Sequence, residues 1–325
     1  MSVRWLQFGA VAMMAWLSAP LLAQDARQYP TRPIRFIVPL PPGGGTDLLA
    51  RTIAPKLGEK WGQTVVVDNR AGASGAIGLD LAAKAVPDGY TIVAGYIAPM
   101  SINVSLTKLP YDPVTDFAPV TLTVLTQNVL VVHPSVPAVT VKELIALLKS
   151  KPGHYHYAST GSGSSPHLSA ELFKIRTGVN MNHVPYRGAG PALIDLIAGQ
   201  VALYFAGVSS ALPHVQAGKL RALAATGSRR SPAMPELPTV AEAGVPGYES
   251  IQWHGVLAPA KTPVWILDKL NRDFVAVLNQ PELKERLLTM GFEVVASSRE
   301  QFASYIKEEI AKWAKVIKEA GIRAD

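Results

Sequence analysis

Short apolar runs alternate with helical segments along most of the chain. A buried strand is predicted for RPIRFIVPL, and a helix for the segment that follows it, TDLLARTIAPKLGEKWG. The same alternation returns in QTVVVDNR, SGAIGLDLAAKAV and TIVAG. Because strands that alternate with helices form largely parallel sheets covered by helices, the pattern predicts an α/β fold.

Two long apolar passages divide the chain into parts. The first, DFAPVTLTVLTQNVLVVHP, precedes a second group of alternating strands and helices, and the second, IQWHGVLAPA, follows that group. Each passage is long enough to cross from one lobe to another. We therefore expect a discontinuous first lobe formed by residues 25–125 and 251–325, with residues 126–250 inserted as a second lobe. Ligands of such two-lobed proteins favour the cleft between the lobes.

The amino-terminal segment has a pattern of its own. It carries Arg4, an apolar run from Trp5 to Leu17 and the small residue Ala23, and its first acidic residue is Asp25. This pattern is typical of a cleavable signal peptide, which we assign to residues 1–23. The apolar run is shorter than the roughly 20 residues that a membrane-spanning helix needs. We expect the mature protein to be soluble and exported.

Composition narrows the chemistry. The 325 residues include no cysteine, which excludes thiolate nucleophiles, thiolate zinc sites and iron–sulfur clusters. The formal net charge is +7, but lysine and arginine are scattered rather than clustered. A nucleic-acid partner is therefore not expected. The charge indicates either a mild attraction toward anionic solutes or only solubility.

The loop PPGGGTD lies between the first predicted strand and helix and suggests a phosphate site. A Walker loop needs a lysine before its Ser or Thr, whereas here Thr46 is followed by Asp47. A dinucleotide fingerprint also fails, because Leu48 stands where its third glycine is needed after Gly43 and Gly45. Nucleotide binding is not expected.

Three further loops share the glycine-rich character of this one. They lie at residues 71–78, 159–167 and 186–191. Glycines let backbone N–H groups approach a ligand, and a helix start adds roughly half a positive charge. One loop alone would be weak evidence, because glycine and proline end strands in most proteins. Four neutral loops around one cleft favour a small carboxylate, which accepts several N–H bonds.

The chain resembles a known family over its whole length from about Tyr29. The resemblance rests on VPLPPGGGTDLLAR, VVVDNRAGASGAIG, PDGYTI, YASTGSGSSPHLSAELF, HVPYRGAGPALIDLIAGQV, SALPHVQAGKLRALAATGSRRSPAMPELPTVAEAGVPGYE and GVLAPA, in that order. The chain is similar to the extracytoplasmic solute receptors of tripartite tricarboxylate transporters, the Bug family. This resemblance implies a location in the periplasm. It also implies the type II periplasmic binding protein fold, with two α/β lobes and a ligand cleft between them. It implies delivery of a carboxylated solute to a membrane permease.

The resemblance also implies which residues hold the ligand carboxylate, chiefly through backbone N–H groups, hydroxyls and ordered waters. Those of the first lobe are Gly43, Gly44, Thr46, Asp47, Ala73, Ser74 and Gly75, and those of the second are Ser159, Thr160, Gly161, Ser164, His167, Tyr186, Arg187 and Gly188. Of these, Asp47 is expected to cap its helix. Arg187 either clamps a second carboxylate or faces solvent or the permease.

One departure from the family pattern concerns the ligand class. Many members carry an acidic residue after the strand that corresponds to VALYFAG, where this chain has Ala206 and Gly207. Without that carboxylate, an amino-acid ligand is disfavoured. We expect a di-, tri- or aromatic carboxylate.

Two rival chemistries have weaker support. A serine hydrolase would need a triad assembled from a serine within 159–165, His167 or His183, and Asp195, and no G-x-S-x-G occurs. His154 and His156 are an isolated pair, so no metal is expected.

We therefore expect a monomeric receptor for uptake, without catalysis or a cofactor. A receptor that signals to a sensor protein is the second interpretation, and a hydrolase is the third.

Overall fold

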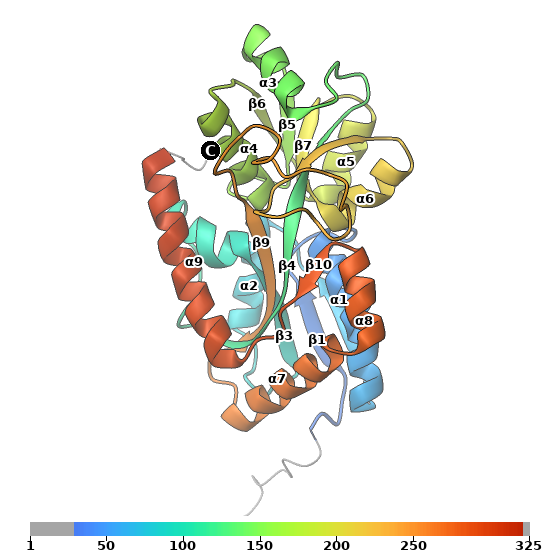
Figure 1. The fold of residues 1–325 in the computed structure, drawn as a ribbon. Helices are drawn as coiled ribbons and strands as arrows, with labels where there is room; N and C mark the ends of the chain where they lie inside the picture. Colours follow the sequence, from blue (N-terminus) through green and yellow to red (C-terminus); the bar gives the residue numbers. More distant parts are fainter. Residues whose placement is uncertain (1–28, 321–325) are drawn as a thin grey trace, which may run out of the picture.

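The computed structural model describes residues 29–320, which form two α/β lobes (Figure 1). The predicted signal peptide, residues 1–23, lies outside the described residues. The strands are β1 (Ile34–Val38), β2 (Val65–Asn69), β3 (Thr91–Tyr96), β4 (Phe117–Val132), β5 (His156–Ser159), β6 (Asn182–Pro185), β7 (Leu203–Gly207), β8 (Arg221–Ala225), β9 (Ile251–Pro259) and β10 (Phe292–Val294). The helices are α1 (Gly45–Trp61), α2 (Ala76–Ala83), α3 (Val141–Ser150), α4 (Ser165–Thr177), α5 (Ala189–Ile197), α6 (Val208–Gln216), α7 (Val264–Leu278), α8 (Pro281–Thr289) and α9 (Arg299–Ala320). Short helical turns lie at Ala73–Gly75 (η1), Ala98–Ile102 (η2) and Asn103–Ser105 (η3).

The strands form one continuous path in the order β2-β1-β3-β9-β4-β7-β5-β6, and β8 and β10 also pair with β4. The outer strands are parallel, as the alternation predicted: β1 pairs with β2 and β3, and β5 with β6 and β7. The two central strands β4 and β9 run antiparallel to each other and to their neighbours. The sheet is mixed at its centre because these strands carry the chain between the lobes.

Both predicted crossing passages are strands. Within β4, residues 117–127 pair with β9, and residues 128–132 pair with β7. Figure 1 shows β4 and β9 side by side, rising from the first lobe, which holds β1–β3 and α7–α9, toward the second, which holds α3–α6. The lobe limits at 125/126 and 250/251 stay a prediction.

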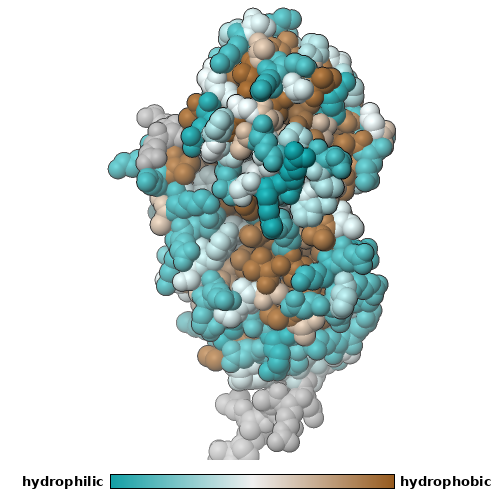
Figure 2. All heavy atoms as spheres, in the orientation of Figure 1, coloured by the Kyte–Doolittle hydropathy of each residue, from teal (hydrophilic) through white to brown (hydrophobic). Residues whose placement is uncertain are grey.

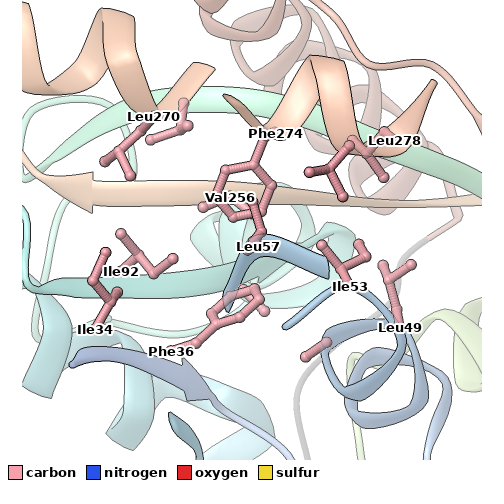
Figure 3. Packing of buried hydrophobic residues seen from close by; sticks show 14 of the residues in the cluster. Ile34, Phe36, Leu49, Ile53, Leu57, Ile92, Val256, Leu270, Phe274 and Leu278 are labelled. Carbon is pink, nitrogen blue, oxygen red and sulfur yellow. The ribbon is translucent and has the colours of Figure 1, made fainter. Parts of the chain in front are cut away.

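The core of the first lobe lies between the sheet and helices α1 and α7. Phe36 of β1 packs edge-on against Phe274 of α7, with ring centroids 6.2 Å apart. Leu57 of α1 and Val256 of β9 close the same cluster (Figure 3). Because each such side chain contributes about 1.5–3 kcal/mol when buried, this cluster fixes α1 and the loop before it.

The carboxy-terminal helix α9 covers the other face of that sheet. Its apolar residues recur at helical spacing: Phe302, Ile306, Trp313 and Ile317 are buried, and Ile310 is partly buried. A Cβ on Gly255 of β9 would lie 2.1 Å from Phe302 Cζ, so only glycine lets this ring lie against the strand. Figure 1 shows α9 along the flank of the first lobe.

The second lobe has its own core around β5, β7 and α3–α5. A capping box opens α3: Glu143 N–H donates to Thr140 Oγ1 (3.1 Å), and Val139 N–H donates to Glu143 Oε2 (2.8 Å). On the face seen in Figure 2, hydrophilic residues cover most of the surface, and hydrophobic ones form a patch in the middle of the view and lie among hydrophilic ones in the upper, second lobe. Within residues 29–320, no helix combines the length and apolar character needed to cross a membrane.

Candidate ligand-binding site

The two lobes touch through the loops at their facing ends. Ser74 Oγ of the first lobe donates to Ser162 O of the second over 3.2 Å. A Cβ on Gly188 would lie only 2.9 Å from Pro41 Cγ, so these two loops are also in contact. These contacts describe a closed cleft, in which a ligand would touch both lobes at once.

Four helices begin at one small cavity inside this cleft, which we call the inner cavity. The N-cap residues of α1, α4, α5 and α6 all line it: Gly44, Ser164, Gly188 and Gly207. No side chain caps α1, α5 or α6, whereas Ser164 Oγ accepts a bond from His167 N–H. The first N–H groups of a helix have no partner within it, so several backbone donors and four positive helix ends meet here.

The inner cavity is small and neutral. Its volume is about 60 Å³. Among the described residues, no Asp, Glu, Lys or Arg lines it. The lining consists of Leu40, Pro41, Gly44, Gly45, Thr46, Tyr96, Thr126, Thr160, Ser164, Ser165, Pro166, Gly188, Ala189, Tyr204, Gly207, Ser209, Ser210, Gln252 and His254. Hydroxyl and backbone donors therefore have to stabilise any anion bound in it.

The histidine of the lining is held in a neutral form. His254 of β9 is buried, its ring stacks on Tyr96, and its Nδ1 lies 3.3 Å from Thr46 Oγ1. Burial lowers the pKa of His254 to about 4, because the charged imidazolium is poorly solvated there. At neutral pH, His254 contributes polarity to the cavity but no charge.

A buried chain of hydrogen bonds starts at the cavity wall and runs into the crossing strands. Gln252 of β9 donates to Asn128 Oδ1 of β4. Asn128 Nδ2 in turn donates to Ser165 Oγ (3.2 Å) and Ser169 Oγ (2.9 Å) at the start of α4. This network ties the amino end of α4 to the point where β4 passes from one lobe to the other.

A wider groove adjoins the inner cavity and shares Leu40, Pro41, Thr160 and Gly188 with it. This outer groove has a volume of about 700 Å³ and is also lined by Ala71, Gly72, Ala73, Ser74, Gly75, Ile77, Gly161, Pro185, Tyr186 and Arg187. Residues from all four predicted glycine-rich loops therefore meet around one space. Arg187 is the cation of this lining, and its side chain is exposed.

The tyrosine of the outer groove is already paired. Tyr186 Oη donates to Asp195 Oδ2 over 2.8 Å. Burial and this carboxylate raise the pKa of Tyr186 to about 12. Its hydroxyl is therefore hydrogen-bonded to a residue of α5, and Tyr186 forms part of the groove wall.

Sequence comparison assigns the chain to a family. Residues 49–322 match the family described as "Tripartite tricarboxylate transporter family receptor". The chain belongs to this family. The resemblance predicted from the sequence is thereby confirmed.

Solved structures of other receptors in this family share the fold. The chain is 41% identical to an R. palustris protein solved with adipate, with a TM-score of 0.89 over 91% of this chain and 100% of that one. It is 36% identical to the periplasmic binding protein BugD, with a TM-score of 0.87 over 91% of this chain and 100% of that one. MatC from Rhodopseudomonas palustris, solved with bound malate, is 32% identical, with a TM-score of 0.84 over 89% and 100%. The predicted two-lobed periplasmic binding protein fold is confirmed.

The structure of this family member distributes the predicted site residues over three places. Gly44, Thr46, Thr160, Ser164 and Gly188 line the inner cavity. The outer groove is lined by Ala73, Ser74, Gly75, Gly161, Tyr186 and Arg187, again with Thr160 and Gly188. Gly43, Asp47, Ser159 and His167 line neither space. Direct ligand contacts by all of these residues stay a prediction.

Asp47 supports the first loop from behind. Its carboxylate accepts bonds from Gly43 N–H (3.0 Å), Arg51 Nε (2.9 Å) and Asn69 Nδ2 (3.0 Å). Burial alone would raise the pKa of the Asp47 carboxyl, but these donors lower it below its usual value. Asp47 thus holds the residues before α1 in place. The expectation that it caps the helix was wrong, because Gly44 is the N-cap of α1 and no side chain caps that helix.

Ser159 and His167 likewise support a loop of the second lobe by accepting hydrogen bonds from its backbone. Ser159 Oγ accepts from Gly161 N–H (3.0 Å) and lies 2.6 Å from His183 Nε2. His167 Nδ1 accepts from Gly163 N–H (3.0 Å), and its ring stacks on His183. Ser159 is fully buried inside the loop, so this serine–histidine pair shapes the loop rather than presenting a nucleophile to the cleft.

Several lining residues escaped the sequence analysis. They are Thr126 of β4, Tyr204 of β7, Ser209 and Ser210 of α6, and Gln252 and His254 of β9. For the two serines a signal was present, because Gly207 precedes them at a strand-to-helix turn like those of the predicted loops. In the described part of the chain, no group of three or more His, Cys, Asp or Glu side chains could hold a metal ion.

Proposed function

We propose that this chain is a non-catalytic receptor that closes its lobes around a small dicarboxylate and presents it to a membrane permease. One observation carries the proposal: four helix N-termini, two lobes and a set of hydroxyls converge on one neutral cavity. Such an arrangement stabilises an anion, and a carboxylate oxygen can accept several of these donors at once.

The dicarboxylate class follows from the two adjoining spaces. The inner cavity is large enough for one carboxylate group, and the outer groove leaves room for the rest of a short chain. Two structural relatives are solved with dicarboxylates, adipate and malate. We place one carboxylate of the ligand in the inner cavity, with its second carboxylate on the side of Arg187.

Lobe closure provides the signal to the permease. The contacts of Ser74 with Ser162 and of Pro41 with Gly188 exist only when the lobes meet, and they surround the ligand position. A ligand that bonds both lobes favours the closed form by its differential affinity for that form. The permease would then recognise a surface that the open form lacks.

Export and the lack of catalysis complete the proposal. The amino-terminal pattern supports a periplasmic location, as does the periplasmic relative BugD. The burial of Ser159 supports a receptor that releases its ligand unchanged.

A thermal-shift screen of the purified protein tests this function. Adipate, malate and succinate are compared with butyrate, putrescine and glucose. A dicarboxylate at a hundred times its dissociation constant should stabilise the fold by ~2.7 kcal/mol, and small-angle scattering should show a smaller radius of gyration. The proposal would be refuted if no carboxylate raised the melting temperature, or if the protein hydrolysed esters of these acids.

A further inference from the structure

Tyr204 of β7 stands apart from the other buried tyrosines. Its side chain is fully buried, and among the described residues no atom forms a hydrogen bond with its hydroxyl. By contrast, Tyr96 donates to Ser74 O (2.8 Å), Tyr111 to Pro99 O (3.0 Å) and Tyr248 to Ser169 O (2.8 Å). Native proteins pair nearly all buried polar groups, so this unpaired phenol needs a reason.

The position of Tyr204 supplies that reason. The residue packs into the apolar cluster of the second lobe and also lines the inner cavity. Thr46 and His254, which come from the first lobe, belong to the same lining. A ligand in this cavity therefore lies beside Tyr204, whose buried hydroxyl has no hydrogen-bond partner among the described residues.

The surroundings of Tyr204 also fix the chemistry of that ligand. The uncapped start of α6 brings Ser209 and Ser210 to the same cavity, and both are buried. These groups offer N–H and O–H donors, and no carboxylate in the described lining competes for them. The inner end of the ligand therefore has to be a hydrogen-bond acceptor, and an anionic one fits the helix ends best.

We propose that the Tyr204 hydroxyl is a ligand-binding donor, which bonds the carboxylate at the inner end of the ligand and selects for an acceptor there. This assignment rests on the proposed function. Burial raises the pKa of Tyr204 above its usual value, so the phenol stays protonated and can donate a hydrogen bond throughout the physiological pH range.

The test compares Tyr204→Phe with Tyr248→Phe. Both variants remove only a hydroxyl from a buried ring, but Tyr248 lines neither the inner cavity nor the outer groove. Calorimetric titration uses adipate and malate as probes, and urea unfolding is measured without ligand. For Tyr204→Phe we expect about tenfold weaker binding, with stability equal to or above that of the wild type. For Tyr248→Phe we expect lower stability and an unchanged dissociation constant.

Each outcome either supports the assignment or overturns it. If the wild type binds a dicarboxylate and Tyr204→Phe binds it equally well, the assignment of Tyr204 is wrong while the proposed function stands. Loss of stability in Tyr204→Phe without loss of affinity would overturn the assignment in the same way, because it would show a structural hydroxyl. If the wild type binds neither acid, the proposed function fails, and this assignment fails with it.

Discussion

The inner cavity and the outer groove are built from the same loops but differ in chemistry. Among the described residues, the inner cavity is lined without a charged side chain, and four helices begin there. The outer groove is more than ten times as large and contains Arg187, which is exposed. From this difference we expect the cleft to hold a carboxylate firmly at its inner end and loosely at its outer end.

The contrast follows from solvation. In the enclosed cavity, backbone dipoles are fixed before the ligand arrives, and little water competes for them, so each bond is strong. At the exposed groove, a guanidinium is screened by water and salt. We therefore expect the inner cavity to supply affinity and the outer groove to adjust it.

The largest effect is expected where the two spaces meet, at Gly188. Its φ of +120° and ψ of 177° belong to a region used almost only by glycine, and a Cβ there would meet Pro41 at 2.9 Å. Gly188→Ala should weaken adipate binding by about 100-fold and lower stability by ~1–3 kcal/mol. Calorimetry and urea unfolding measure both.

Gly44→Ala is the matched control for Gly188→Ala. Gly44 is also an N-cap at the inner cavity, but its φ is −84°, and an added Cβ would lie 3.9 Å from Ala189 Cβ. Its effect on affinity should be much smaller. Equal losses in the two variants would show that loop contact does not control closure.

The next effect concerns the neutrality of the inner cavity. The pKa of His254 is about 4 in the folded protein, against an ordinary value of 6.5, so the unfolded chain binds more protons between these values. The free energy of unfolding should therefore fall as the pH drops from about 6.5 to 4, by up to about 3 kcal/mol. His254→Gln should remove this part of the slope, as urea unfolding at several pH values would show.

The wild-type curve is the reference for His254→Gln. The two curves should run parallel well above pH 6.5, where His254 is uncharged in both the folded and the unfolded chain. A wild-type curve that stays flat between pH 6.5 and 4 would mean that His254 is not held neutral by burial.

The smallest effect is expected in the outer groove. If Arg187 meets the second carboxylate, Arg187→Gln should weaken adipate binding about two- to fivefold, and the loss should shrink at high salt. Arg176, an exposed residue on α4 away from both spaces, serves as the control. An unchanged dissociation constant for Arg187→Gln would place this guanidinium toward solvent or the permease.

Much of the architecture could be predicted because it depends on local patterns. The apolar runs indicated the strands, and the spacing of Phe302, Ile306, Trp313 and Ile317 indicated the buried face of α9. The capping box at Thr140 was equally local. The parallel order of the outer strands followed from their alternation with helices, whereas the antiparallel centre was not anticipated.

The candidate site could be predicted only in part. Glycine-rich loops are visible in the sequence, and their repetition in four places, rather than any one of them, indicated a site. Which residue of a loop faces the ligand was not visible: Thr46 lines the cavity, whereas its neighbour Asp47 bonds Gly43 and Arg51 behind it. One step along a helix start rotates the side chain by about 100 degrees, and this decides its role.

The sequence by itself therefore determined the elements, the two lobes and the class of ligand, because periodicity and glycine placement act over a few residues. The tertiary structure alone decided which strand residues line the inner cavity. Tyr204, Gln252 and His254 lie inside apolar strands, and nothing local shows that they face a cavity. They meet only because β4 and β9 cross between the lobes and bring distant segments against four helix ends. Contacts between segments that lie far apart along the chain produce no local pattern in the sequence, so they could not be predicted from it.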